Sequence, residues 1–249
     1  MAKILDGKLA LVTGGSRGIG AATALRLADD GADVAISYHA SGDRAHAVVE
    51  QLEAKGVRAA AFRADQGEPE QAQRLIREVM STFGRLDILV NNAGITVMAP
   101  IDDPSIDIAA LDRQHAVNYT GVVAAIREAI KHMGDGGRII NIGSGVATRV
   151  GTPGMTDYTA SKAALAGYTR GAARDLAARG ITVNLVQAGL TDTEGNPAGS
   201  EYAPVFSANV ALGRYARPEE IAVGVAFLAR PDSTYITGTV LDVDGGYMA

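Results

Sequence analysis

The chain has 249 residues, of which 47% are hydrophobic and 20% are charged, and its formal net charge is −5. This length allows one domain with a sizeable core, and the ordinary composition excludes a disordered or fibrous protein. The negative charge argues against a nucleic-acid partner, and the absence of cysteine excludes disulfides, thiol catalysis and cysteine-ligated zinc.

Strand-length apolar runs alternate with helix-length amphipathic stretches from Lys8 onward, and this alternation is typical of a parallel sheet wrapped by helices. The expected strands are residues 9–12, 34–37, 59–62, 88–91, 138–142, 182–186 and 240–243. The expected helices are residues 18–30, 43–55, 68–83, 108–133, 158–179 and 218–228. We therefore predict an α/β protein over residues 1–249, a single Rossmann-type domain whose doubly wound parallel sheet of about seven strands carries helices on both faces.

One long segment, residues 189–217, has no sustained periodicity and is rich in Gly, Pro, Thr, Asn and Ser. Long irregular segments in compact domains are usually lids or binding loops, so we predict a substrate lid here. The alternative is a surface excursion with one short helix.

The first expected strand leads into a glycine-rich turn that contains Gly14, Gly18 and Gly20 and opens a helix. Glycines let the backbone approach a pyrophosphate, which then sits at the helix N-terminus. The position between a strand and a helix favours dinucleotide binding over an ordinary turn.

Four motifs share one resemblance. They are T-G-x-x-x-G-x-G from Thr13, N-N-A-G over residues 91–94, Tyr158-x-x-x-Lys162 and D-G-G over residues 244–246. Together they resemble the short-chain dehydrogenase/reductase family over essentially the whole chain. The resemblance implies hydride transfer between a nicotinamide cofactor and a ketone or secondary alcohol, and a homotetramer built through the helices that hold Asn118 and Tyr158.

The end of the second strand bears on the choice of cofactor, because it lacks the carboxylate that would repel a 2′-phosphate. Arg17 offers a guanidinium to such a phosphate, so we predict that NADP(H) is preferred over NAD(H). The alternative is that Arg17 is only a solvated cation at the helix start. From the turn, the second strand and the resemblance, the expected cofactor-binding residues are Gly14, Ser16, Arg17, Gly18, Ile19, Gly20, Ser37, His39, Ser41, Asp65, Gln66, Asn92, Ala93, Gly94, Tyr158, Lys162, Gly189, Thr191 and Thr193. Asp65 has the alternative role of capping the following turn.

The expected catalytic pair is Tyr158 and Lys162, which lie four residues apart on one helix face. Hydride addition builds negative charge on the substrate oxygen, and a phenol placed beside it donates a proton. The Lys162 ammonium favours the phenolate that results, and the resemblance adds hydrogen bonds to the cofactor ribose. The structural alternative is a surface contact between the two side chains.

The resemblance assigns two further catalytic residues, Ser144 and Asn118. Ser144 would steady the substrate oxygen, although its spacing of fourteen residues to Tyr158 is one more than in common members, and Ser161 offers another hydroxyl. Asn118 would hold a water linked to the lysine. Its alternative role is a purely structural hydrogen bond to backbone.

The substrate is expected to be a small ketone or alcohol. A 3-oxoacyl-acyl-carrier-protein reductase is the alternative, but the turn at residues 134–137 reads Gly-Asp-Gly-Gly where such reductases are often basic. Residues 187–189 also depart from the family's usual Pro-Gly. An alternative of another class is a non-catalytic NADP-binding sensor.

Membrane, secretion and metal signals are all missing from the sequence. Lys3, Asp6 and Lys8 interrupt any signal-like apolar start, and no apolar run approaches membrane length. The four histidines, at 39, 46, 115 and 132, have no metal-ligand spacing. We expect a cytoplasmic protein with no membrane partner and no catalytic metal.

Overall fold

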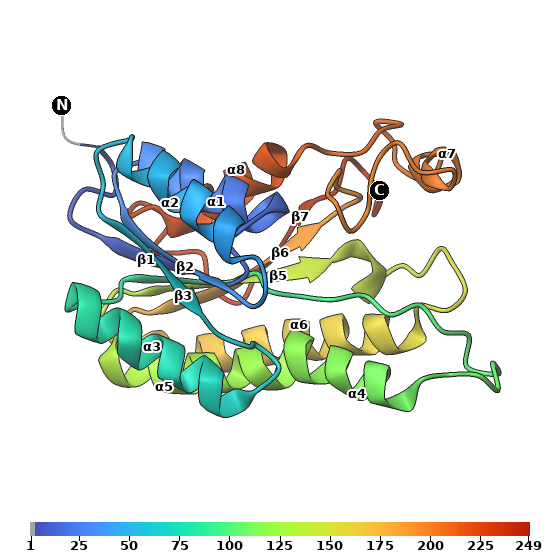
Figure 1. The fold of residues 1–249 in the computed structure, drawn as a ribbon, viewed down its shortest axis with the longest axis horizontal. Coiled ribbons are helices and arrows are strands. Elements are labelled where there is room, and N and C mark those ends of the chain that lie inside the picture. The colour runs from blue at the N-terminus through green and yellow to red at the C-terminus, as the bar shows by residue number, and fades with distance from the viewer. Residues whose placement is uncertain (1–2) are drawn as a thin grey trace.

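A seven-stranded parallel sheet forms the centre of the computed structural model, which describes residues 3–249 (Figure 1). Its strands are β1 (Leu9–Val12), β2 (Asp33–Tyr38), β3 (Ala59–Arg63), β4 (Ile88–Asn91), β5 (Arg138–Ser144), β6 (Thr182–Ala188) and β7 (Val240–Val243). Their order in the sheet is β3-β2-β1-β4-β5-β6-β7, and every neighbouring pair is parallel. All residues of β1 and β4 are buried, as expected for central strands covered on both faces. The predicted fold class is therefore confirmed.

Helices cover both faces of this sheet. They are α1 (Gly18–Asp29), α2 (Gly42–Glu53), α3 (Pro69–Phe83), α4 (Ile108–His115), α5 (Gly121–His132), α6 (Thr156–Leu176), α7 (Ala203–Ser207) and α8 (Pro218–Ala229). In Figure 1, α1, α2 and α8 lie on one side of the sheet, and α3, α5 and α6 lie on the other.

The core has two layers because successive side chains of a strand point to opposite faces of the sheet. In β1, Ala10 and Val12 join the cluster beneath α1 and α8, whereas Leu9 and Leu11 join the cluster beneath α3, α5 and α6. All four side chains are fully buried. Because both faces of the strand are buried, its residues form a continuous apolar run in the sequence, and such runs predicted the strands.

The strand order reverses between β1 and β4, which are neighbours in the sheet but far apart in the chain. At such a switch point the loops leaving the carboxyl ends of the two strands diverge and open a crevice for a ligand. Thr13 at the end of β1 donates its N–H to the Val90 carbonyl at 3.0 Å, so the two strands stay paired up to the crevice.

The predicted helix over residues 108–133 is wrong in one respect. Between α4 and α5 lies a π-helical segment, Ala116–Thr120, so one turn of an otherwise continuous helix is wider than an α-helical turn. Asn118 lies in this turn, and its side chain bonds to the backbone of Ile95 instead of facing solvent. Hydrophobic periodicity does not report such a local change of hydrogen-bond register.

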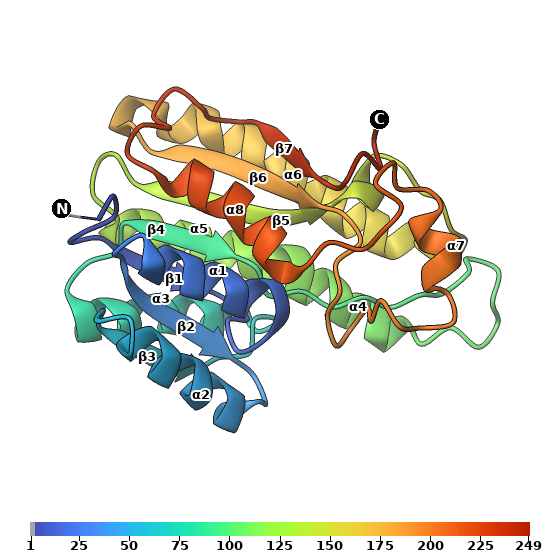
Figure 2. The same ribbon diagram turned by 90° about the horizontal axis from the view of Figure 1, so that it is seen from above.

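The segment 189–217 contains more structure than its composition indicates. Its ends are joined, because Ala216 donates to the Leu190 carbonyl at 2.8 Å and Asp192 donates to the Ala216 carbonyl at 2.9 Å. Between them lies α7, which Figure 2 shows beyond the carboxyl ends of β5 and β6.

In residues 3–249, no helix has both the length and the apolarity needed to cross a membrane.

Candidate active site

The glycine turn between β1 and α1 lies at the crevice. Gly14 and Gly18 adopt left-handed backbone angles, with φ of 65° and 52°, which glycine reaches without steric cost. The Gly14 N–H bonds to the Ser37 hydroxyl at 3.2 Å, and a Cβ at Gly14 would lie 3.0 Å from the Ala93 Cα. The turn is therefore packed against the ends of β2 and β4.

Asn92 ties β4 to this turn. Its Nδ2 donates to the carbonyls of Thr13 at 2.8 Å and Gly14 at 3.2 Å. The Thr13 hydroxyl in turn accepts hydrogen bonds from the N–H groups of Asn92 at 3.0 Å and Ala93 at 3.1 Å. Thr13 is fully buried, so these bonds fix the relative position of the two loops that line the crevice.

Tyr158 and Lys162 come from the start of α6, which begins two residues earlier than predicted. The Lys162 Nζ lies 5.9 Å from the centre of the Tyr158 ring and donates to the Ile142 carbonyl at 2.9 Å. Lys162 is 5% exposed, whereas Tyr158 is half-buried. The structure brings the ammonium and the phenol ring together, as the sequence predicts.

Gly94 lies beside both Lys162 and Asn118. A Cβ at Gly94 would lie 3.4 Å from the Lys162 Nζ and 3.3 Å from the Asn118 Oδ1. Gly94 itself is exposed. The Lys162 ammonium and the Asn118 amide therefore lie next to solvent-exposed backbone that follows β4. Side chains from α6 and the π-helical segment thus converge on the end of β4.

The side-chain amide of Asn118 makes three hydrogen bonds within the protein. It donates to the Ile95 carbonyl at 2.9 Å and to the Ser161 hydroxyl at 3.2 Å, and its Oδ1 accepts the Ile95 N–H at 3.0 Å. The Ser161 hydroxyl donates to the Tyr158 carbonyl at 2.7 Å. Asn118 and Ser161 therefore brace the first turn of α6, and Ser161 has no hydrogen left to offer a substrate.

Ser144 is the last residue of β5, half-buried, and begins the segment that leads to α6. The next residue, Gly145, packs against Tyr247: a Cβ at position 145 would lie 2.9 Å from that ring. The Tyr247 hydroxyl donates to the Arg149 carbonyl at 2.9 Å. The carboxyl-terminal end of the chain thus holds the backbone around Ser144.

A chain of buried polar groups fixes α6 on the sheet. Asn91 of β4 donates to Asn141 of β5 at 2.9 Å, Asn141 donates to the Thr169 hydroxyl at 2.9 Å, and Thr169 donates to the Leu165 carbonyl at 2.9 Å. Asn141 and Thr169 are fully buried. Because unpaired polar groups are costly in a core, these bonds favour one register of α6 and so place Tyr158 and Lys162.

On the β2–β3 side of the crevice, Asp65 accepts hydrogen bonds from Arg113 and from the Gly67 N–H, the latter at 2.8 Å. Partial burial alone would raise the pKa of Asp65, but the bonds from Arg113 and Gly67 outweigh it and lower this pKa. The His39 Nδ1 lies 3.7 Å from the same carboxylate. Gln66 is 6% exposed, and its Nε2 has no protein partner.

The remaining residues predicted to bind the cofactor differ in how far they are exposed to solvent. Ser37 and Thr191 are buried, and their hydroxyls contact the Gly14 N–H and the Gly189 carbonyl. Half-buried or exposed residues on the glycine turn, the β2 end and the start of segment 189–217 are Ser16, Arg17, Ile19, Ser41, Gly189 and Thr193. Gly20 is buried in the first turn of α1.

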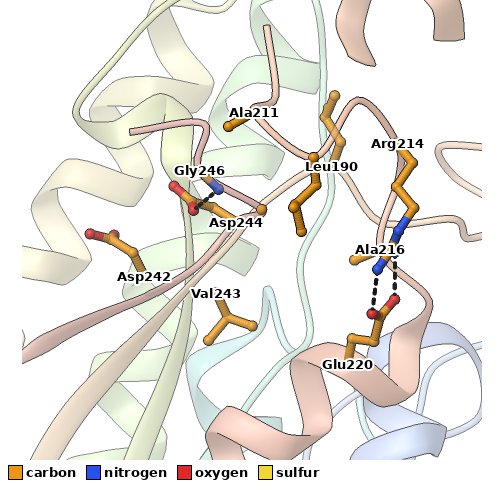
Figure 3. A pocket seen from close by; sticks show the side chains of 11 residues that line it. Leu190, Ala211, Arg214, Ala216, Glu220, Asp242, Val243, Asp244 and Gly246 are labelled. Carbon is orange, nitrogen blue, oxygen red and sulfur yellow. Dashed lines mark hydrogen bonds and ion pairs between the residues drawn. The ribbon is translucent and has the colours of Figure 1, made fainter. Parts of the chain in front are cut away.

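A cavity of about 500 Å³ lies between segment 189–217 and the end of β7 (Figure 3). Leu190 and Asp244 line it, and the doubly hydrogen-bonded pair of Arg214 and Glu220 forms one wall, at 2.8 Å for each bond. Tyr158 does not line this cavity. Lys162 and Asn118 are not among its lining residues either.

Three charged residues near the crevice were missed by the sequence analysis. Arg113 binds Asp65, and Arg44 and Glu194 form an ion pair next to Arg17. Arg44 and Glu194 are 150 positions apart, so no local pattern joins them.

No group of three or more histidine, aspartate or glutamate side chains placed to hold a metal occurs in residues 3–249.

Comparison with known proteins places this geometry in a family. A family profile described as enoyl-(acyl carrier protein) reductase matches residues 14–248. A 3-oxoacyl-(acyl-carrier-protein) reductase of Staphylococcus aureus is 42% identical over 246 residues, which cover 96% of this chain and 97% of that protein.

Two solved structures are similar over nearly their whole length. A short-chain dehydrogenase from Burkholderia cenocepacia in complex with NADP has a TM-score of 0.97 and 49% identity, covering 99% of this chain and 100% of that one. A blue fluorescent protein from a metagenomic library, in complex with NADPH, has a TM-score of 0.96 and 48% identity, with the same coverage. Together with the profile, the glycine turn and the Tyr158–Lys162 pair, these similarities show that the chain belongs to the short-chain dehydrogenase/reductase family of oxidoreductases.

Proposed function

We propose that this oxidoreductase is an NADPH-dependent carbonyl reductase, which converts a ketone to a secondary alcohol with Tyr158 as the general acid. In the reverse direction Tyr158 acts as the base. The observation that carries the proposal is the convergence of Lys162 and Asn118 on the exposed backbone at Gly94, with the Tyr158 ring beside the Lys162 ammonium.

The residues of the crevice fit a dinucleotide. Helix α1 begins at Gly18 with no side-chain cap and no acidic residue in its first turn, so its first N–H groups are available to a pyrophosphate. The half-exposed Arg17 stands beside them. The buried Nε2 of Gln66 has an unmet hydrogen-bonding need on the same side. When bound, NADPH would supply the hydride. The NADP and NADPH held by the two solved relatives support this assignment.

Tyr158 and Lys162 would divide the proton chemistry. As charge builds on the carbonyl oxygen, the Tyr158 hydroxyl donates its proton to that oxygen. The Lys162 ammonium, held near the ring by the Ile142 carbonyl, stabilises the phenolate that remains. The same ammonium has further N–H groups for a ribose hydroxyl.

Ser144 and Asn118 would support the Tyr158–Lys162 pair in different ways, Ser144 through the substrate and Asn118 through the protein backbone. Ser144, at the end of β5, would donate a hydrogen bond to the substrate oxygen and so hold that oxygen at Tyr158. Asn118 sets the position of the Ile95 backbone and, through Ser161, of the first turn of α6. Segment 189–217 would close over the substrate as a lid, since its ends are joined and its middle projects beyond the strand ends.

The Staphylococcus aureus relative supports a second candidate, reduction of 3-oxoacyl groups on acyl carrier protein. That acidic partner needs unpaired cations on this chain. Arg179 is instead occupied by the Ile130 and Met133 carbonyls and by Asp135, whose Oδ1 lies 3.3 Å from the arginine Nε. These bonds remove Arg179 from such a docking surface, whereas Arg174 of α6 is exposed and has no ion pair among residues 3–249. The departure at residues 134–137 and the pairing of Arg179 favour a free ketone, and Arg174 is the cation left for a carrier protein.

The test is steady-state oxidation of NADPH or NADH with a panel of ketones, a 3-oxoacyl coenzyme A and the same acyl group on acyl carrier protein. We expect kcat/KM to be at least about tenfold higher with NADPH than with NADH, since a hydrogen bond to a charged phosphate contributes about 1.5–3 kcal/mol. A ratio of one or less contradicts the cofactor assignment. No turnover with any ketone or thioester contradicts the reductase itself, and a strong preference for the carrier-bound thioester favours the second candidate.

A further inference from the structure

Two arginines from different βα loops meet one carboxylate. Arg17, in the glycine turn, and Arg44, in the first turn of α2, both hydrogen-bond Glu194 of segment 189–217. Arg17 Nη1 lies 3.0 Å from Glu194 Oε2, and Arg44 Nη1 lies 2.6 Å from Glu194 Oε1. The two guanidinium groups thus share one small anion between the glycine turn and the end of β2.

Glu194 is held in this place by a tight turn. Thr193 donates to the Asn196 carbonyl at 3.3 Å, and Asn196 donates back to the Thr193 carbonyl at 3.0 Å, so Glu194 and Gly195 form the tip. The Thr193 methyl group lies 3.2 Å from where a Cβ on Gly18 would be. The tip of the segment therefore packs directly on the glycine turn.

The arginines stay accessible from solvent. The side chains of Arg17, Arg44 and Glu194 are 57%, 52% and 52% exposed. Helix α2, which contains Arg44, begins at Gly42, and the side chain of its N-cap residue Ser41 makes no capping hydrogen bond, so the first turn of α2 has N–H groups without a side-chain cap. Two accessible guanidinium groups beside helix N–H groups can bind a phosphate as readily as they bind a carboxylate.

We propose that Glu194 is an internal competitor for the 2′-phosphate of NADP(H): its carboxylate occupies a clamp made of Arg17, which the sequence analysis already assigns to that phosphate, and of Arg44, which we add as the second arm. The proposal rests on the NADPH-dependent function above and adds Arg44 and Glu194 to it as specificity-determining residues. The 2′-phosphate must displace the carboxylate, which both blocks the two guanidinium groups and repels the incoming anion. NADH, which has no 2′-phosphate, does not meet this competition.

Removal of the competing charge should therefore strengthen binding of the phosphorylated cofactor alone. In Glu194→Gln the side chain keeps its size but loses its charge. Because exposed ion pairs are weak, we expect the Kd for NADPH to fall by about two- to tenfold, with little change for NADH. Conversely, Arg44→Gln should raise the Kd for NADPH and leave that for NADH unchanged. Both effects should shrink at high salt.

The experiment measures Kd by fluorescence titration with NADPH and NADH, and by calorimetry with adenosine 2′,5′-bisphosphate, at low ionic strength. Glu201→Gln is the matched control, because it removes the same charge from an exposed position of the same segment. A Glu194→Gln variant that binds NADPH no better than wild type, or more weakly, overturns the competitor. An unchanged NADPH affinity in Arg44→Gln overturns the clamp.

These outcomes separate the two proposals. If wild type prefers NADPH but the Glu194→Gln and Arg44→Gln variants match it, the proposed function stands and the clamp with its competitor fails. If wild type binds neither NADPH nor the bisphosphate, both fail together. Glu194→Ala, which also removes the hydrogen-bond acceptor, should change the NADPH Kd in the same direction as Glu194→Gln.

Discussion

At the scale of single residues, the candidate site depends on how closely polar groups approach the backbone after β4. Gly94 is the contact point, because the Lys162 ammonium and the Asn118 carbonyl oxygen both lie within van der Waals reach of a Cβ added there. A side chain at this position would compete with the groups that position Tyr158. The last residue of the N-N-A-G motif is therefore a glycine for a packing reason that does not depend on a cofactor.

Gly94→Ala tests this packing. The added methyl group would lie 3.3 Å from the Asn118 Oδ1 and 3.4 Å from the Lys162 Nζ, so one of the two must shift by a few tenths of an ångström. We expect kcat to fall by about tenfold, because small misplacements of catalytic groups cost rate steeply. The measurement is kcat with NADPH and the best ketone of the panel.

Gly134→Ala is the control for this substitution, because a Cβ at Gly134 has no neighbour within 4 Å and the residue is exposed. Its kcat should equal that of wild type. Unchanged kcat in Gly94→Ala would show that the Lys162 and Asn118 side chains do not need their present positions.

At the scale of elements, α3 and α5 are joined by a charge cluster. Glu128 of α5 is 7% exposed and accepts hydrogen bonds from Lys131 at 2.7 Å and from His132 at 3.3 Å, while the Arg77 Nη1 of α3 lies 3.3 Å away. The bond from Lys131, followed by those from His132 and Arg77, outweighs the effect of burial and lowers the pKa of Glu128 to about 2.

This shift predicts how stability changes with pH. The pKa of Glu128 is lower in the folded chain than the ordinary value of 4.5, so its carboxylate contributes stability above about pH 4.5. That contribution is lost as the pH falls from about 4.5 toward 2. We expect Glu128→Gln to be less stable than wild type at pH 7, because Arg77 and Lys131 lose their shared anion, and the difference to shrink across this acid range.

Urea denaturation at a series of pH values measures this effect. Glu53→Gln is the control, since Glu53 is exposed on α2 and has no ion pair among residues 3–249. Its free energy of unfolding should track that of wild type at every pH. A Glu128→Gln variant as stable as wild type at pH 7 would contradict the role of the cluster.

At the scale of the whole molecule, the sequence predicts what depends on local periodicity. The strands are buried on both faces, so their apolar runs were recognisable, and β1 and β4 have the predicted bounds. The glycine turn was recognisable because it follows β1 at once. The meeting of Tyr158 and Lys162 follows from their spacing within α6.

What the sequence did not predict depends on contacts between distant segments. The side chain of Asn118 in the π-helical turn bonds to Ile95 on another loop, which no local pattern reports. A short helix in segment 189–217 was named only in the alternative interpretation, and α7, with five residues, is too short for its position to be read from a period. The ion pairs of Glu194 with Arg17 and Arg44 join residues 177 and 150 positions apart. Only the order of strands in the sheet, with its switch between β1 and β4, brings such residues to one crevice.

Tyr158→Phe is the most direct test of the account, because it removes one oxygen and keeps the ring that packs beside Lys162. The measurement is kcat for ketone-dependent NADPH oxidation, together with the Kd for NADPH on the same preparation. The account predicts that kcat falls by at least about a hundredfold, the usual scale of general acid catalysis, while NADPH still binds. Near-normal turnover in a folded Tyr158→Phe variant that binds NADPH would contradict it.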